Sequence, residues 1–275
     1  MTPPTFKIER EIMTSVAHIA QRSHRPLHLD EAGWRMLLEQ CGPSLGLWRA
    51  AEVAALREQR YERPILDLGC GDGLMTSLVL PQVELGLDPW PQALAQAARR
   101  GIYKQLLPLT IEAALLPARS YATVISNSVL EHLERIDVVL QEIARVLHPG
   151  GRLIFTAPTE AFGAALALPL RGYITWRNRQ LNHLNLWSVE RWAERLKRSG
   201  LELEEARPYL RLRLVWLWDA LELLQHIRAG RRRLFPLVWR RVPAALLDRL
   251  ARQAARLDLS APAPGGGRLI VARKR

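Results

Sequence analysis

The sequence predicts an α/β fold in which a mostly parallel sheet carries helices on both faces. Three observations support this prediction: apolar runs typical of buried strands alternate with helical stretches, a glycine-rich turn follows the first run, and a carboxylate ends the second. The turn is Gly69-Cys70-Gly71-Asp72-Gly73, and the carboxylate is Asp88. Strands and helices that alternate in this way are typical of doubly wound, Rossmann-like sheets.

The first elements lead into this turn. Residues 8–59 are predicted to be mostly helical, and the stretch 44–52 is expected to enter a helix beside the ligand cleft. Because helices separate the strands that follow, these strands are expected to be parallel. They are predicted near residues 64–68, 83–87, 122–126 and 152–157.

The next helix has clear end signals. Ser188 is a good N-cap residue, and the helix that it opens is expected to end near Ser199 because Gly200 follows. Two further strands are then predicted, at about 201–206 and 268–273.

An insertion of basic and aromatic character separates these last two strands. Its first part, 209–227, has the period of a helix that is apolar over most of its surface, and its few polar side chains share one narrow stripe. These are Arg211, Asp219, Glu222 and His226. An aromatic stretch flanked by arginines and a second amphipathic helix follow, at 235–239 and 244–257. We therefore expect an N-terminal helical segment, a ligand-binding domain and the insertion, over residues 1–59, 60–208 with 265–275, and 209–264.

The glycine turn and two carboxylates suit a ligand that has a ribose and a cationic group. Gly69, Gly71 and Gly73 can adopt backbone angles closed to other residues and carry no Cβ, so a ligand can lie against the main chain. Asp67, at the end of the first strand, is placed to attract an ammonium group. Asp88, at the tip of the neighbouring strand, can accept hydrogen bonds from both hydroxyls of a ribose.

Two cofactors compete for such a turn, a dinucleotide and S-adenosylmethionine. A dinucleotide requires the spacing G-x-G-x-x-G, with a helix N-terminus aimed at the pyrophosphate. Here the third glycine comes one residue early, Leu74 stands in its place, and Asp72 would repel the phosphates. S-adenosylmethionine carries no phosphate and tolerates both features.

At these residues the chain resembles the class I S-adenosylmethionine-dependent methyltransferases, in particular the subgroup with a D-x-G-C-G-x-G signature. The resemblance covers about residues 60–160 and the end of the chain, and the segments 112–117, 126–133 and 144–155 also carry it. It implies transfer of a methyl group from S-adenosylmethionine and a final strand that lies antiparallel beside the preceding one. The cofactor-binding residues that it implies are Asp67, Gly69, Cys70, Gly71, Gly73, Asp88, Pro89, Glu112, Ala113 and Asn127.

Two residues depart from the pattern of that family. Ala122 stands where the family usually has an aspartate after an aromatic residue, and Glu112 replaces the commoner aspartate. These departures concern the contacts to adenine and leave the ribose contact of Asp88 unaffected.

Methyl transfer to a hydroxyl needs an aligned acceptor and a base that removes a proton. His132 is the first candidate for that base, because it follows the Asn127 loop at the mouth of the cleft; a structural histidine is the alternative. His183, in a segment similar to one that lines the acceptor pocket in the family, is the second candidate. Glu131 and His132 are neighbours on a predicted helix and are expected to point apart, so no metal site is predicted.

The positive charge of the chain is confined to one region. The sequence has 39 basic and 27 acidic side chains and a net charge of +12, and residues 207–275 hold 16 of the basic and 4 of the acidic ones. Basic residues among Trp, Phe and Leu suit a membrane interface, so an anionic membrane surface and a lipid-linked or otherwise amphiphilic acceptor are predicted partners. A lid formed by two helices that pack on each other explains the same pattern equally well.

The remaining features limit the alternatives. No recognised RNA-binding module accompanies the basic residues, so RNA methylation is kept only as an alternative, beside a non-catalytic cofactor-binding protein. Cys41 and Cys70 predict no disulfide framework and favour a cytoplasmic location. Neither a signal peptide nor a spanning helix is expected. We therefore expect a cytoplasmic enzyme, peripheral at the inner face of the membrane if the insertion contacts lipid, that methylates an oxygen of a small or lipid-linked acceptor.

Overall fold

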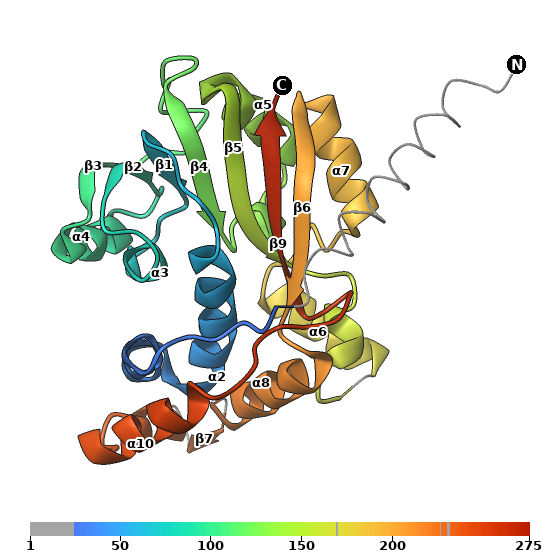
Figure 1. Ribbon diagram of the computed structural model, residues 1–275. Coiled ribbons are helices and arrows are strands. Elements are labelled where there is room, and N and C mark those ends of the chain that lie inside the picture. The colour runs from blue at the N-terminus through green and yellow to red at the C-terminus, as the bar shows by residue number, and fades with distance from the viewer. Residues whose placement is uncertain (1–24, 169, 226, 230–231) are drawn as a thin grey trace, which may run out of the picture.

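The computed structural model describes residues 25–275 apart from 169, 226 and 230–231, and it contains a seven-stranded sheet between two layers of helices (Figure 1). The strands are β1 (Ile65–Leu68), β2 (Val83–Leu87), β3 (Tyr103–Leu107), β4 (Tyr121–Asn127), β5 (Leu147–Pro158), β6 (Leu201–Tyr209) and β9 (Gly267–Lys274). Their order is β3-β2-β1-β4-β5-β9-β6, and β9 is antiparallel to both of its neighbours while the others pair in parallel. The predicted doubly wound sheet with an antiparallel last strand is confirmed.

Within the seven-stranded sheet, the strand that was not predicted is β3, at one edge. Lys104 and Gln105 at its centre are exposed, so the segment lacks the continuous apolar run of a strand that is covered on both faces. An edge strand with polar side chains is common because such residues discourage pairing with other chains.

A long helix, α2 (Glu31–Arg57), leads into the sheet. Asp30 caps it by accepting a hydrogen bond from the Gly33 amide at 2.7 Å. Gly42, with a φ of 75°, and Pro43 kink the helix. The part after the kink, which includes the predicted stretch 44–52, is almost entirely buried. The helix predicted over residues 8–24 lies outside the described residues.

The other helices pack on the faces of the sheet or on α2 at one end of it. Two buried apolar clusters hold them: one joins α2, α8 and α10 to one face, and the other joins α5 and α7 to the opposite face. These elements and the remaining ones are α3 (Leu74–Ser77), α4 (Pro91–Arg100), α5 (Ile136–Val146), α6 (Arg171–Gln180), α7 (Val189–Arg198), α8 (Leu212–Gln225), α9 (Leu234–Trp239), α10 (Ala244–Ala254), the 3₁₀ turns η1 (Leu130–His132) and η2 (Phe162–Ala165), and the hairpin strands β7 (Arg228–Ala229) and β8 (Arg232–Arg233). In Figure 1, α2, α6, α8 and α10 gather at the end of the sheet where β4 finishes.

The polar side chains in the middle of α8 face the protein. Asp219 is fully buried, and Glu222 accepts a hydrogen bond from the Ser44 hydroxyl of α2. The opposite side of the helix exposes apolar side chains, among them Trp216 and Leu224. The predicted stripe is therefore turned inward at these two positions, and His226 lies outside the described residues. Within the described part of the chain, no helix combines the length and the hydropathy needed to cross a membrane.

Candidate functional site

The glycine turn joins β1 to α3 and is held by the neighbouring strand. The amides of Gly69 and Cys70 both donate to the Leu87 carbonyl, at 2.8 and 3.0 Å. Gly69, Gly71 and Gly73 have φ values of 73°, 54° and 73°, a region that other residues rarely adopt. The shape of the turn is thus set by the protein itself.

The three glycines differ in their surroundings. A Cβ at Gly69 would clash with Val129, and one at Gly73 would lie 2.9 Å from the ring of Tyr103. A Cβ at Gly71 would meet no heavy atom within 4 Å. Gly71 therefore faces open space in which a ligand can lie against the backbone.

Asp88 stands at the tip of β2, beside this open space. Its Oδ2 atom accepts a hydrogen bond from the Gly71 amide and its Oδ1 atom accepts one from the Trp90 amide, both at 2.9 Å. Each oxygen keeps a further lone pair, so the fixed carboxylate can still accept hydrogen bonds from two ribose hydroxyls. Pro89 and Trp90 follow it at the surface, and Trp90 is 68% exposed. Gly71 and Asp88 together fit the nucleoside part of S-adenosylmethionine.

Asp67 is buried behind the turn. Its Oδ2 atom accepts hydrogen bonds from the hydroxyls of Thr76 and Tyr103, both at 2.6 Å. Burial raises the pKa of Asp67 to about 6, although these two hydrogen bonds act in the opposite direction. Asp67 thus fastens α3 and β3 to the end of β1, and its contact with a cationic group stays a prediction.

The other predicted cofactor residues lie at different depths. Cys70 is buried, and burial raises the pKa of its thiol. Glu112 is half-buried and lines a surface groove between the segment after β3 and α5, whereas Ala113 is exposed. Asn127, at the end of β4, accepts a hydrogen bond from Thr156 at 2.8 Å and donates one to Glu52 at 3.2 Å. The contacts of these residues with the cofactor also stay predictions.

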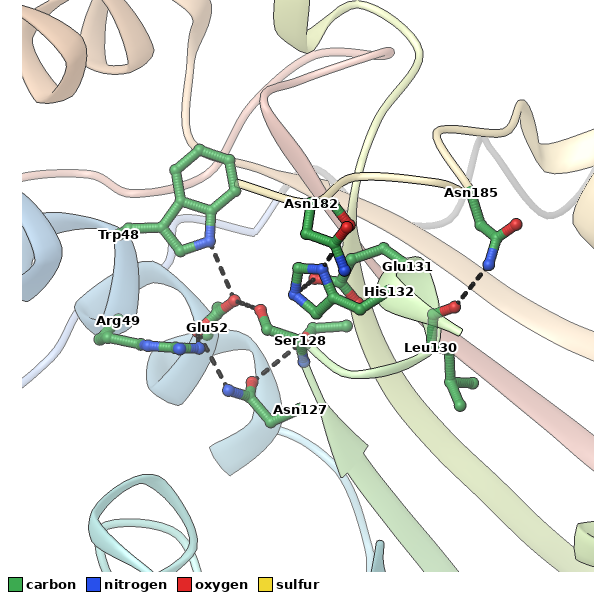
Figure 2. A network of polar contacts seen from close by, with 11 residues as sticks. Trp48, Arg49, Glu52, Asn127, Ser128, Leu130, Glu131, His132, Asn182 and Asn185 are labelled. Carbon is green, nitrogen blue, oxygen red and sulfur yellow. Dashed lines mark hydrogen bonds and ion pairs between the residues drawn. The ribbon is translucent and has the colours of Figure 1, made fainter. Parts of the chain in front are cut away.

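Glu52, on α2, is the centre of a polar network that the sequence did not indicate (Figure 2). The side chain is fully buried and accepts hydrogen bonds from four groups. The donors are Trp48 Nε1 at 2.9 Å, Arg49 at 2.7 Å, the Asn127 amide at 3.2 Å and the Ser128 hydroxyl. The network joins α2 to the carboxyl end of β4.

Beside this network lies a cavity of about 180 Å³, which we name the aromatic cavity. Its walls include Trp48 from α2, Phe162 from η2 and Trp218 from α8, whose rings contact one another with centroids 5.3 to 5.6 Å apart. Trp218 belongs to the insertion, so α8 forms part of the cavity wall while its other side is exposed.

Both predicted catalytic histidines line the aromatic cavity. Their rings stack with centroids 5.7 Å apart. His132 also contacts the main-chain carbonyl of Asn182, the residue before His183 and 50 residues along the chain. Burial, together with the nearby His132, lowers the pKa of His183 to about 4. Its Nδ1 atom is buried without a hydrogen-bond partner. His183 is therefore a neutral group at physiological pH.

The prediction that Glu131 and His132 point apart is wrong. Glu131 Oε1 lies 3.8 Å from His132 Nε2. Both residues belong to the 3₁₀ turn η1, and α5 begins only at Ile136. Burial raises the pKa of Glu131 to about 8. In the described part of the chain, no group of three or more His, Cys, Asp or Glu side chains is arranged to hold a metal ion.

The glycine turn and the aromatic cavity are joined by one short segment, 128–132. Val129 packs against Gly69, where a Cβ would clash with it. Ser128, Glu131 and His132 line the cavity. Segment 128–132 thus contacts the glycine turn at Gly69 and also forms part of the cavity wall.

The class of protein follows from three features: the seven-stranded sheet, the glycine turn after β1 and the carboxylate of Asp88 after β2. Together they define a class I S-adenosylmethionine-dependent methyltransferase. The sequence model of the family described as "Methyltransferase domain" matches residues 46–206, more than half of the chain, and the chain belongs to this family. The match ends in β6, so the insertion lies outside it.

Similar proteins agree with this family. An uncharacterized methyltransferase of Schizosaccharomyces pombe is 27% identical over 51% of this chain and 59% of its own length. A ubiquinone biosynthesis O-methyltransferase of Rhizobium etli is 27% identical over 54% of this chain and 66% of its own. The chain thus spans about two thirds or less of these relatives. A solved structure from Thermotoga maritima, described as a possible histamine N-methyltransferase, shares the fold with a TM-score of 0.55 and 16% identity, covering 88% of this chain and 100% of that one.

Proposed function

We propose that the protein transfers the methyl group of S-adenosylmethionine to an oxygen of a small or amphiphilic acceptor that binds in the aromatic cavity. One observation carries this proposal: the segment 128–132 touches the glycine turn through Val129 and lines the cavity through Ser128, Glu131 and His132. A cofactor on the turn and an acceptor in the cavity would therefore be close neighbours. Holding two reactants in this way is the main contribution that the protein makes to a transfer reaction.

The chain's own residues supply binding and orientation. Asp88 and the open face of Gly71 would hold the cofactor, whose sulfonium supplies an activated methyl group when bound. The aromatic walls would exclude water from the acceptor. Three buried polar atoms without partners are available to the acceptor's own polar groups: Glu131 Oε2, His183 Nδ1 and Trp218 Nε1.

Oxygen is the favoured methylated atom for two reasons. The cavity contains groups that can take a proton from a hydroxyl, Glu131 and His132. The ubiquinone biosynthesis O-methyltransferase of Rhizobium etli, by its name, acts on oxygen.

Filling the aromatic cavity tests the assignment of the acceptor site. Leu45 lines the cavity and is 39% exposed, so Leu45→Trp should fill the space without entering the core. We expect the variant to lose about tenfold or more of the methyl transfer that the wild type shows in a screen of hydroxylated compounds and lipid extracts with isotope-labelled cofactor. Its affinity for S-adenosylmethionine should not change.

A matched control for this variant is Leu109→Trp, which enlarges another exposed leucine outside the cavity. The control should transfer methyl groups as the wild type does. Full activity of Leu45→Trp would show that the acceptor binds elsewhere.

We also infer that the exposed side of α8 contacts an anionic membrane surface, from which an amphiphilic acceptor would reach the cavity. Trp216, Leu217 and Leu224 are 52%, 39% and 50% exposed on the side of α8 opposite Trp218. The nearby helix α10, which also packs on α2, exposes Arg249 and Arg252, and Arg256 is exposed just after its end. Apolar side chains beside arginines favour the interface of an anionic bilayer.

Co-sedimentation with liposomes of phosphatidylserine and phosphatidylcholine tests this contact. We expect the wild type to bind and Trp216→Ser with Leu224→Ser to lose most of the binding, because less apolar area enters the interface. Leu115→Ser is the matched control, since Leu115 is 85% exposed on a different part of the surface. If part of the wild-type binding persists in moderate salt, burial of apolar side chains contributes to it, because salt screens only the charges. If the wild type and the double variant sediment equally, α8 does not contact the membrane, and the lid interpretation of the insertion remains.

A further inference from the structure

Glu131 is a buried carboxyl group at the wall of the aromatic cavity, and one of its oxygens has no hydrogen-bond partner. The residue is 1% exposed, lines the cavity, and has its Oε2 atom buried without a hydrogen-bond partner. Buried polar atoms normally have such a partner. An atom of this kind at the wall of a cavity is available to a group of the bound molecule.

The groups around Glu131 do not neutralise it. The charged and titratable groups that face it or share its cavity are Arg49, Glu52, His132, His183 and Tyr209. Arg49 already pairs with Glu52 at 2.7 Å. Burial dominates and raises the pKa of Glu131 to about 8, with a smaller contribution of the same sign from Glu52. A backbone hydrogen bond, the Arg49 charge and the Ser128 hydroxyl act in the opposite direction. A group that titrates near the working pH is well suited to general base catalysis.

A route for protons leads from Glu131 to solvent through His132. His132 Nδ1 lies 2.9 Å from the Asn182 carbonyl, which can only accept, so the proton of the neutral ring is on Nδ1. Nε2 is then the basic nitrogen, and it lies 3.8 Å from Glu131 Oε1. The His132 side chain is 34% exposed, whereas the carboxyl group is buried. This distance is longer than a hydrogen bond, so a proton would pass from Glu131 to His132 through one water molecule or after a small shift of the ring, and then from His132 to solvent.

We propose that Glu131 is the catalytic base of the methyl transfer and that the acceptor group is a hydroxyl on a planar ring, a phenol or an enol. This inference rests on the proposed function. The O–H bond breaks and its proton goes to Glu131 Oε2, while the oxygen forms the new bond to the methyl carbon as the carbon–sulfur bond breaks and sulfur keeps the electron pair. The proton then moves to Nε2 of His132 and to solvent, which restores the carboxylate. His132, expected from the sequence to be the base, is the relay in this scheme.

The cavity favours this class of acceptor by shape and by acidity. Trp48, Phe162 and Trp218 give it aromatic walls, against which a flat ring packs well. A phenol, with a pKa of about 10, is within reach of such a carboxylate base, whereas a hydroxyl as weakly acidic as water, with a pKa of about 15.7, is not. A carboxylate acceptor needs no base and would be repelled by ionised Glu131.

Nitrogen-15 NMR of the histidine side chains in the full chain tests the proton route without any acceptor. Between about pH 6 and pH 9.5, we expect the His132 ring to show an inflection near pH 8 that comes from Glu131. Glu131→Gln should remove this inflection. Glu142→Gln, at a half-buried pair with Arg145 on α5, should retain it, and His132→Gln assigns the resonance. An His132 ring that does not sense Glu131 overturns the proposal.

Kinetics with the acceptor found in the screen test the chemical step. We expect kcat to rise with pH through about 8 and Glu131→Gln to lower kcat about 100-fold or more, with the KM of the acceptor changed less than about threefold. Unchanged cofactor affinity of the variant would show that it is folded. Full kcat in Glu131→Gln, or an acceptor that is an aliphatic alcohol or a carboxylate, would overturn the proposal and leave the proposed function standing.

Absence of any transfer by the wild type would instead contradict the proposed function, and the NMR titration would still decide whether Glu131 and His132 share a proton.

Discussion

Replacement of Asp219 by alanine is expected to lower the free energy of unfolding by about 3–5 kcal/mol. Asp219 is fully buried on α8 and pairs with Arg177 of α6, at 2.8 Å, and Arg177 is 1% exposed. The variant leaves the arginine charge buried without its counterion, over the ring of Trp218. Chemical denaturation of the wild type and the variant measures the difference.

Removal of both charges separates loss of the ion pair from loss of packing. The double variant Asp219→Leu with Arg177→Met should recover most of the stability, because apolar residues of similar size often replace a buried ion pair at little cost. A single variant as stable as the wild type would show that α8 and α6 are not held together by this pair.

Glu131→Gln is expected to become more stable relative to the wild type as the pH rises. The folded pKa of Glu131, about 8, is above the ordinary value of 4.5, so the folded chain binds more protons than the unfolded chain between these values, and the wild type loses stability as the pH rises through 8. Between about pH 6.5 and pH 8 the relative gain of the variant should be about 2 kcal/mol.

The choice of this pH window isolates Glu131 from two other shifted groups. The folded pKa of Asp67 is about 6 and that of His183 about 4, so both act on stability below about pH 6.5. Denaturation curves at several pH values above that point measure the effect, and Glu142→Gln should show none of it. Parallel stability curves for the wild type and Glu131→Gln would mean that Glu131 is already ionised at neutral pH.

The sheet and the cofactor side of the site could be predicted because their signals are local in the sequence. The glycine turn follows β1 directly, and Asp88 ends the next strand, so parallel pairing of β1 and β2 alone brings them together. The one strand of the seven-stranded sheet that was missed, β3, lies at an edge and has exposed polar residues in place of an apolar run.

The walls of the aromatic cavity could not be predicted in the same way. Glu52 meets Asn127 and Ser128 across 75 and 76 residues of sequence, and neither periodicity nor a motif marks that contact. For α8 the sequence shows that most of the helix is apolar, but not which side faces the protein; that side carries Asp219, whose partner Arg177 lies on α6.

The prediction that the Glu131 and His132 side chains point apart was wrong. The expectation considered only the angle between the Cα–Cβ bonds of neighbouring residues. The two side chains are long enough to bend toward each other, and their ends, Glu131 Oε1 and His132 Nε2, lie 3.8 Å apart. The two histidines, by contrast, were both recognised as candidates from their segments, and the structure brings them together in one cavity.

Calorimetric titration with S-adenosylmethionine tests the central claim, that the turn with Gly71 and Asp88 binds this cofactor. Gly71→Ala and Gly101→Ala form a matched pair, because both glycines have a positive φ, 54° and 71°, and both have open space where a Cβ would stand. We expect the wild type and Gly101→Ala to bind equally, Gly71→Ala to lose binding, and Asp88→Ala to bind more weakly by about 1–3 kcal/mol. No binding by the wild type, or equal binding by all four proteins, would contradict the account.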